Sequence, residues 1–176
     1  MKTPGVKSDT RTTTNPTVVI AAIFIMRTIK FKFTIDDDVR RHFQIYNPAL
    51  IHFQVTTYLN DPDGWGIFFE PVDHGESVHI RLSMPAIIYK HCDHTNLSCA
   101  ELGGRNVWLN AARWFHGAPK SKLSLEDYRQ YVVSHEIGHI LGFDHKKCPC
   151  KGCKAPIMMQ QTQGIGECKP NTKVKP

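Results

Sequence analysis

The chain has 176 residues, which suits one domain able to bury about 70% of the surface that its unfolded form exposes. Its composition, with 41% hydrophobic and 22% charged residues, is ordinary for a globular protein. No internal repeat, low-complexity segment or Gly/Ser linker divides the sequence, which excludes a repeat architecture.

The formal net charge of +6 is concentrated at the C-terminal end. Residues 146–176 contain seven lysines and one acidic residue, Glu167, so the rest of the chain is balanced. Such a region can attract acidic substrates or an anionic surface, or it can simply be a solvated surface. No aromatic residue interleaves with these lysines, so a nucleic-acid groove is not expected.

The first segment, residues 1–26, is a polar leader followed by the apolar run Val18–Met26. Nine residues are too few to span a bilayer, which requires about twenty. The run fits the core of a short signal peptide behind basic residues, and it equally fits the start of a strand. We therefore divide the chain into a leader or signal segment at 1–26 and a single domain at 27–176.

Alternating apolar residues predict a half-buried strand over Arg27–Ile35. A helix is expected over residues 48–59, with Asn47 as its cap and Pro48 at its first position. Residues 61–64, Asp-Pro-Asp-Gly, form a turn. Three further strands are expected at residues 67–72, 78–84 and 107–110. The last of these is expected to be an edge strand near the cleft.

The last predicted helix runs from about 125 to 142, and Ser124 with Asp127 caps its start. Within it, His135 and His139 are four residues apart and therefore project from the same face. Gly142 lets the chain leave the helix sharply and present His145. Three histidine ligands leave one position of a tetrahedral zinc ion open for water, which is the catalytic pattern.

Glu136 follows the first of these histidines and points about 100° around the helix. It can therefore contact a metal-bound water without being a ligand, which predicts a general base. The remaining histidines of the central region are expected at the surface rather than on the metal: His91, His94 and His116.

Residues 155–162 read Ala-Pro-Ile-Met-Met-Gln-Gln-Thr. The long zinc motif followed by such a segment resembles the metzincin clan of zinc proteases, in which a methionine turn lies beneath the metal. Met158 and Met159 are the candidates for this turn, and we favour Met158. The alternative is that both methionines fill a gap in the core.

The chain more closely resembles a family of bacterial, mostly secreted, metzincin-like proteins whose label supplies no substrate. The resemblance covers roughly residues 58–171 and is densest over 107–163. It is carried by Val107–Trp114, Gly117–Pro119, Tyr128–Val133, the zinc helix and Met158–Thr162.

The resemblance implies an α+β, metzincin-like fold. A twisted mixed sheet and two main helices would lie above the cleft, with the zinc helix as its floor. Residues 143–176 would form a short lower part that carries the methionine turn. Some relatives have Asp as the third metal ligand, which makes Asp144 an alternative to His145. Arg113, Trp114 and Tyr131 would line or stiffen the cleft, with packing the expected role.

The six cysteines indicate disulfides formed in an oxidising compartment. Cys92–Cys99 and Cys148–Cys168 are the favoured pairs, which leaves Cys150–Cys153. The last four cysteines allow three connectivities, and the third pair is additional to the family pattern. The alternative is a second, structural zinc held by these four residues.

Together these features predict a secreted or cell-surface zinc endopeptidase, a monomer with one catalytic Zn²⁺, that cleaves peptide or protein substrates. Two alternatives use the same scaffold: a zinc-binding module without turnover, and a zinc amidase acting on non-protein amides. The intact Glu136 argues against the first, because a module without turnover has no need of the base.

Overall fold

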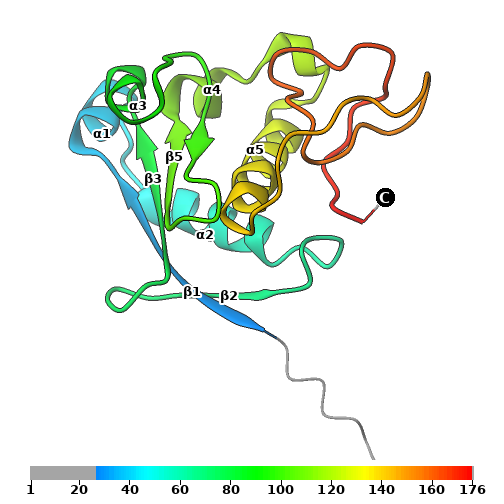
Figure 1. Ribbon diagram of the computed structural model, residues 1–176. Helices are drawn as coiled ribbons and strands as arrows, with labels where there is room; N and C mark the ends of the chain where they lie inside the picture. Colours follow the sequence, from blue (N-terminus) through cyan, green and yellow to red (C-terminus); the bar gives the residue numbers. More distant parts are fainter. Residues whose placement is uncertain (1–26, 176) are drawn as a thin grey trace, which may run out of the picture.

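A five-stranded sheet in the order β2-β1-β3-β5-β4 organises the computed structural model, which describes residues 27–175 (Figure 1). Four strands run parallel, and β4 pairs antiparallel with β5. The predicted leader or signal segment lies outside the described residues. The strands are β1 (Thr28–Ile35), β2 (Phe68–Pro71), β3 (Val78–Ser83), β4 (Cys99–Ala100) and β5 (Asn106–Asn110).

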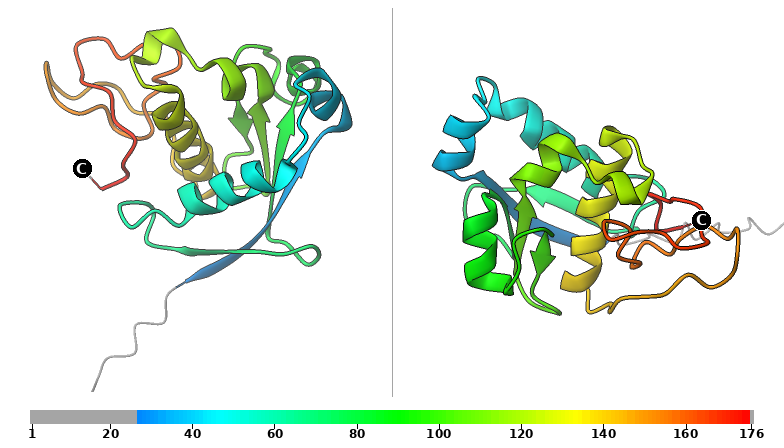
Figure 2. Two further views of the ribbon diagram at one scale, coloured as in Figure 1. Left: turned by 180° about the vertical axis from the view of Figure 1, so that it is seen from behind. Right: turned by 90° about the horizontal axis from the view of Figure 1, so that it is seen from above.

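Helices cover both faces of this sheet. On one face, α2 and α5 pack against each other and against the strands. On the other face, His91 of α3 stacks on Trp108 of β5, with ring centroids 4.4 Å apart. Seen from above, α3 and α5 therefore lie on opposite sides of β5 (Figure 2). The helices are α1 (Asp37–His42), α2 (Pro48–Leu59), α3 (Pro85–Cys92), α4 (Ala111–His116) and α5 (Leu125–Ile140).

The apolar core lies between the sheet and the helices α2 and α5. Every second residue of β1 and β3 is buried there, as the alternating pattern predicts for strands with one face on the core. Full burial of each such side chain contributes about 1.5–3 kcal/mol. The residues that the two strands supply are Ile29, Phe31, Phe33, Val78, Ile80 and Leu82.

Helix α5 has defined signals at both ends. Ser124 Oγ accepts a hydrogen bond from the Asp127 amide at 3.1 Å, which confirms the predicted N-terminal cap. At the other end the amides of Gly142 and Phe143 donate to the carbonyls of His139 and Gly138. Gly142 has φ of 90°, a conformation that glycine adopts cheaply. The helix consequently ends at Ile140, two residues before the predicted boundary.

Several elements differ from the sequence-based expectations. Asn47 precedes α2, but its side chain makes no capping hydrogen bond. The predicted edge strand is internal, because β4 pairs with it through Cys99 opposite Trp108. The mixed sheet is confirmed, while three helices beyond the two main ones were not predicted: α1, α3 and α4.

Residues 143–175 form the lower part beside α5, away from the sheet (Figures 1 and 2). This part contains no helix or strand, and its only β-pairing is an isolated bridge between Lys154 and Lys169. Disulfides and buried amide hydrogen bonds hold it together instead. The structure pairs the six cysteines as the sequence favours: Cys92–Cys99, Cys148–Cys168 and Cys150–Cys153.

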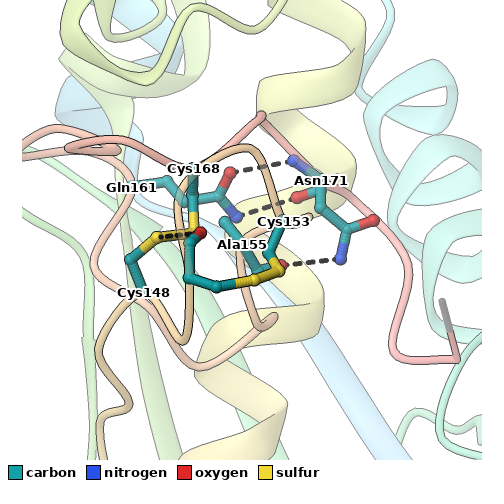
Figure 3. The surroundings of a disulfide bond; sticks show 7 residues. Cys148, Cys153, Ala155, Gln161, Cys168 and Asn171 are labelled. Carbon is teal, nitrogen blue, oxygen red and sulfur yellow. Dashed lines mark hydrogen bonds between the residues drawn. A yellow bond between two sulfur atoms is a disulfide. The ribbon is translucent and has the colours of Figure 1, made fainter.

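Beside these disulfides, the buried side chains of Gln161 and Asn171 form hydrogen bonds that connect distant segments of the lower part (Figure 3). Gln161 Nε2 donates to the backbone carbonyl of Asn171 at 2.8 Å, and the backbone amide of Asn171 donates to Gln161 Oε1 at 3.0 Å. Asn171 Nδ2 also donates to the Ala155 carbonyl at 2.9 Å. The lower part has no helix or strand to pair its buried polar groups, and these side-chain hydrogen bonds pair them instead. Among residues 27–175, no helix is both long and apolar enough to cross a membrane.

Candidate metal centre

Three histidines converge at the C-terminal end of α5. His135 and His139 come from the helix, and His145 comes from the segment that turns back after Gly142. One ring nitrogen of each lies within 4.8 Å of the others. The Nε2 atoms of His139 and His145 are 3.1 Å apart. The predicted triad is therefore a cluster able to hold a metal ion.

Backbone carbonyls orient two of these rings. His135 Nδ1 lies 2.9 Å from the Ile157 carbonyl, and His139 Nδ1 lies 2.9 Å from the Phe143 carbonyl. A carbonyl only accepts, so each Nδ1 carries the proton and each Nε2 offers a lone pair. This arrangement fixes the tautomer that binds a metal through Nε2.

Burial keeps the histidines on the helix neutral. Burial lowers the pKa of His135 to about 4, with the Ile157 hydrogen bond acting in the opposite direction. Burial and then the charge of His145 lower the pKa of His139. Neutral imidazole is the form that binds metal, so both rings are ready as ligands at neutral pH.

Glu136 is the unusual group of the site. Its side chain is buried, and its Oε2 has no hydrogen-bond partner within residues 27–175. Burial without a partner raises its pKa to about 8. An unpaired buried carboxyl group is costly, so its position beside three imidazoles fits a divalent cation with a bound water.

Met158 packs directly against α5 at Gly138, the residue before His139. A Cβ atom added to Gly138 would clash with Met158 Sδ and would come within 2.8 Å of Trp65 Cζ2. Gly138 lies between His135 and His139, so the thioether reaches the helix backbone between the two histidines. Of the two candidate methionines, Met158 is the one in this position.

Met159 contributes its backbone instead. Tyr131 Oη donates to the Met159 carbonyl at 2.8 Å and accepts from the Gln161 amide at 2.8 Å. Tyr131 is fully buried on α5, so it ties the methionine segment to the helix that carries the histidines. Trp114, by contrast, is a core residue.

The histidine triad and Glu136 line a cavity of about 220 Å³. Tyr131 packs in the core and also lines this cavity. Much of the remaining wall comes from the loop closed by the Cys92–Cys99 disulfide and from the methionine segment. The residues from these two segments include His94, Leu97, Ser98, Gln160 and Thr162.

The alternative ligands have other positions. Asp144 lines the cavity but lies outside the histidine cluster, and its Oδ1 accepts a hydrogen bond from the His145 amide at 2.6 Å. The four C-terminal cysteines form disulfides rather than a second zinc site. His91 stacks on Trp108, and His116 is exposed.

A family model described as "Protein of unknown function (DUF3152)" matches residues 12–173. The chain belongs to this family. The match extends beyond residues 58–171, over which the sequence resembles metzincin-like proteins. No curated protein matches this DUF3152 chain.

Two solved structures of myroilysin show a distant likeness to this family member. They are each 16% identical, have TM-scores of 0.43 and 0.41, and align with 70% and 67% of this chain. The chain spans 46% and 48% of their lengths, about half. Archaemetzincin (AmzA) from Archaeoglobus fulgidus is 14% identical with a TM-score of 0.37, over 80% of this chain and 96% of its own.

Sequence reasoning did not identify several residues of the site. The carbonyls of Ile157 and Phe143 orient the ligands through backbone atoms, which no side-chain pattern reveals. His94 was expected at the surface, but it is half-buried in the cavity wall. The short spacing of Cys92 and Cys99 is the signal that could have indicated this wall, because the disulfide closes a loop that ends in β4.

Proposed function

We propose that the chain is a zinc-dependent endopeptidase in which His135, His139 and His145 hold one zinc ion. The observation that carries the proposal is the meeting of three imidazoles and one unpaired buried carboxyl group, that of Glu136, in a single cavity. This combination of a three-histidine site and an adjacent acid is typical of metal-assisted hydrolysis.

The protein's own groups have distinct tasks in this proposal. The carbonyls of Ile157 and Phe143 hold the imidazoles in position before substrate arrives. Zinc, when bound, lowers the pKa of a bound water and polarises the carbonyl of the substrate. The charge of a bound zinc ion would favour the ionised form of Glu136, which accepts the proton of the attacking water and passes it to the leaving amine. The side chain is free for this task because its Oε2 has no other partner within the described residues.

The protein is also proposed to act outside the cytoplasm, as a monomer. Three disulfides support an extracellular location, because such bonds persist in oxidising compartments. The lysines of the lower part are proposed to favour contact with anionic surfaces.

Two other functions share this scaffold. A zinc-binding module without turnover would not need Glu136, so the buried, unpaired acid favours an enzyme. An amidase acting on non-protein amides would use the same residues and differ only in its substrate.

Digestion of a peptide library by the oxidised, zinc-loaded protein separates these functions. Cleavage of peptides supports the proposal, and the cleaved sequences give the subsite preferences. Binding of zinc without cleavage of any peptide or amide supports the module. Cleavage confined to a panel of non-protein amides supports the amidase.

A further inference from the structure

A second cavity, of about 600 Å³, adjoins the metal-site cavity. The two cavities share His94, Leu97 and Thr162 as lining residues, so a ligand bound at the metal site can extend into the second. The residues that line the second cavity include His94, Asn96, Leu97, Arg113, Lys120 and Thr162.

The charge of this second cavity is positive. Arg113 and Lys120 line it, and among the described residues no Asp or Glu does. Within residues 27–175, neither of these cations forms an ion pair. The metal-site cavity, by contrast, contains Glu136 and Asp144. Unneutralised cations in a concave site attract anionic ligands.

The guanidinium of Arg113 is held in place. Its Nε donates to the Asn96 carbonyl at 2.9 Å. Its backbone amide donates to Asn110 Oδ1 at 3.2 Å, and Asn110 Nδ2 donates to the Thr95 carbonyl at 2.8 Å. The two terminal nitrogens of Arg113 make no hydrogen bond to any described residue. A fixed planar fork with free donors is suited to binding a carboxylate through two hydrogen bonds.

Thr162, which lines both cavities, is held by a buried tyrosine of α5. Thr162 Oγ1 lies 3.1 Å from Tyr128 Oη. Burial raises the pKa of Tyr128 to about 12, whereas the Thr162 hydrogen bond and the charge of Arg113 act in the opposite direction.

We infer that the second cavity is a substrate subsite that recognises a carboxylate, with Arg113 as its principal ligand and Lys120 as an additional cation. The enzyme then prefers peptides with Asp or Glu close to the cleaved bond. This inference rests on the proposed peptidase function and names the class of substrate for it.

The test compares two peptides that differ only by Glu or Gln at one position near the cleaved bond. The Glu/Gln pair is made for each position on either side of the cleaved bond. At the position that reaches the second cavity, the wild type should cleave the Glu peptide with a kcat/KM about tenfold or more above that of its Gln counterpart, because a hydrogen bond to a charged group is strong. Arg113→Gln should bring this ratio close to one, and Lys120→Gln should reduce it. Lys122→Gln removes an exposed lysine that lines neither cavity and should leave the ratio unchanged.

Binding separates failure of this inference from failure of the proposed function. Fluorescence anisotropy of the labelled peptides with the Glu136→Gln variant measures the preference without turnover. If no peptide is cleaved but the Glu peptide still binds more tightly in an Arg113-dependent way, the subsite stands and the peptidase proposal fails.

Arg113→Lys keeps the charge and should retain part of the preference, which controls for misfolding of Arg113→Gln. Equal cleavage and equal binding of the two peptides at every position would overturn the inference. A Glu preference that survives Arg113→Gln would overturn it as well.

Discussion

Met158 Sδ packs against Gly138, the residue directly before the second helical histidine, His139, and leaves no room there for a Cβ atom. The histidine pair and the methionine segment are thus one packed unit, although about twenty residues of sequence separate them. The isoleucine before this methionine, Ile157, supplies the carbonyl that orients His135. Packing under the helix and orientation of the ligand therefore depend on the same short segment.

Gly138→Ala should destabilise the domain and weaken metal binding. The added methyl group must displace Met158 and Trp65, and overpacking of this kind typically costs about 1–3 kcal/mol. Urea unfolding and zinc titration measure the two effects. In a Met158→Ala background, Gly138→Ala should cause a smaller loss of stability and of zinc affinity. Equal losses in the two backgrounds would show that the contact is not the cause.

The three histidines should differ in their contribution to the stability of the metal-free protein. His135 is buried and bonded to Ile157, so His135→Ala should lower the free energy of unfolding by about 1–3 kcal/mol. His145 is exposed, and His145→Ala should change it by about 0.5 kcal/mol or less. Both variants should lose most of their zinc affinity. Unfolding in the presence of a chelator, and zinc titration without it, test the two statements.

The Asp61–Lys173 contact should make the attachment of the C-terminal end sensitive to acid. Burial raises the pKa of Asp61, but hydrogen bonds from Lys173, the Asp63 amide and Gln130 outweigh it, so the net pKa is lowered. A carboxyl group with a lowered pKa stabilises the fold above its unfolded pKa of about 3.9, and this stabilisation is lost as the pH falls towards the folded value.

Asp61→Asn should therefore lose about 1–2 kcal/mol at neutral pH and show a shallower loss of stability between about pH 5 and pH 3. Urea unfolding across this range measures the slope. Asp73→Asn is the control, because this exposed aspartate forms no ion pair within the described residues. An unchanged slope in Asp61→Asn would contradict the assignment.

The two disulfides of the lower part should differ in their effect on stability. Cys148–Cys168 closes a loop with a sequence separation of 20, whereas Cys150–Cys153 has a separation of 3. In the chain-entropy model the longer loop contributes about 3 kcal/mol and the shorter about half of that. Paired Cys→Ser variants, compared by urea unfolding, test this order. A larger loss for the shorter loop would contradict it.

Much of the fold and site is determined locally and could be predicted. The alternation in β1, the proline at the start of α2 and the Ser124 cap of α5 are short-range signals, and the structure confirms each element. The spacing of the three histidines likewise depends on one helix and one glycine. The three short helices carry too few residues for a periodic pattern, so the sequence did not reveal them.

Long-range contacts account for what could not be predicted. The strand β5 is internal only because the disulfide loop adds β4 beside it. The carbonyl of Ile157 meets His135 across 22 residues, and Arg113 Nε donates to the carbonyl of Asn96 across 17 residues. Such relationships depend on how distant segments pack, which local patterns do not encode.

The cleavage rate of zinc-loaded Glu136→Gln tests the central claim most directly. If Glu136 is the general base, this variant should bind one zinc ion per chain as the wild type does, and kcat should fall by about 100-fold to 10,000-fold. Glu167→Gln, a change at an exposed ion pair of the lower part, should retain wild-type activity. Wild-type cleavage by Glu136→Gln with zinc bound would contradict the proposed mechanism.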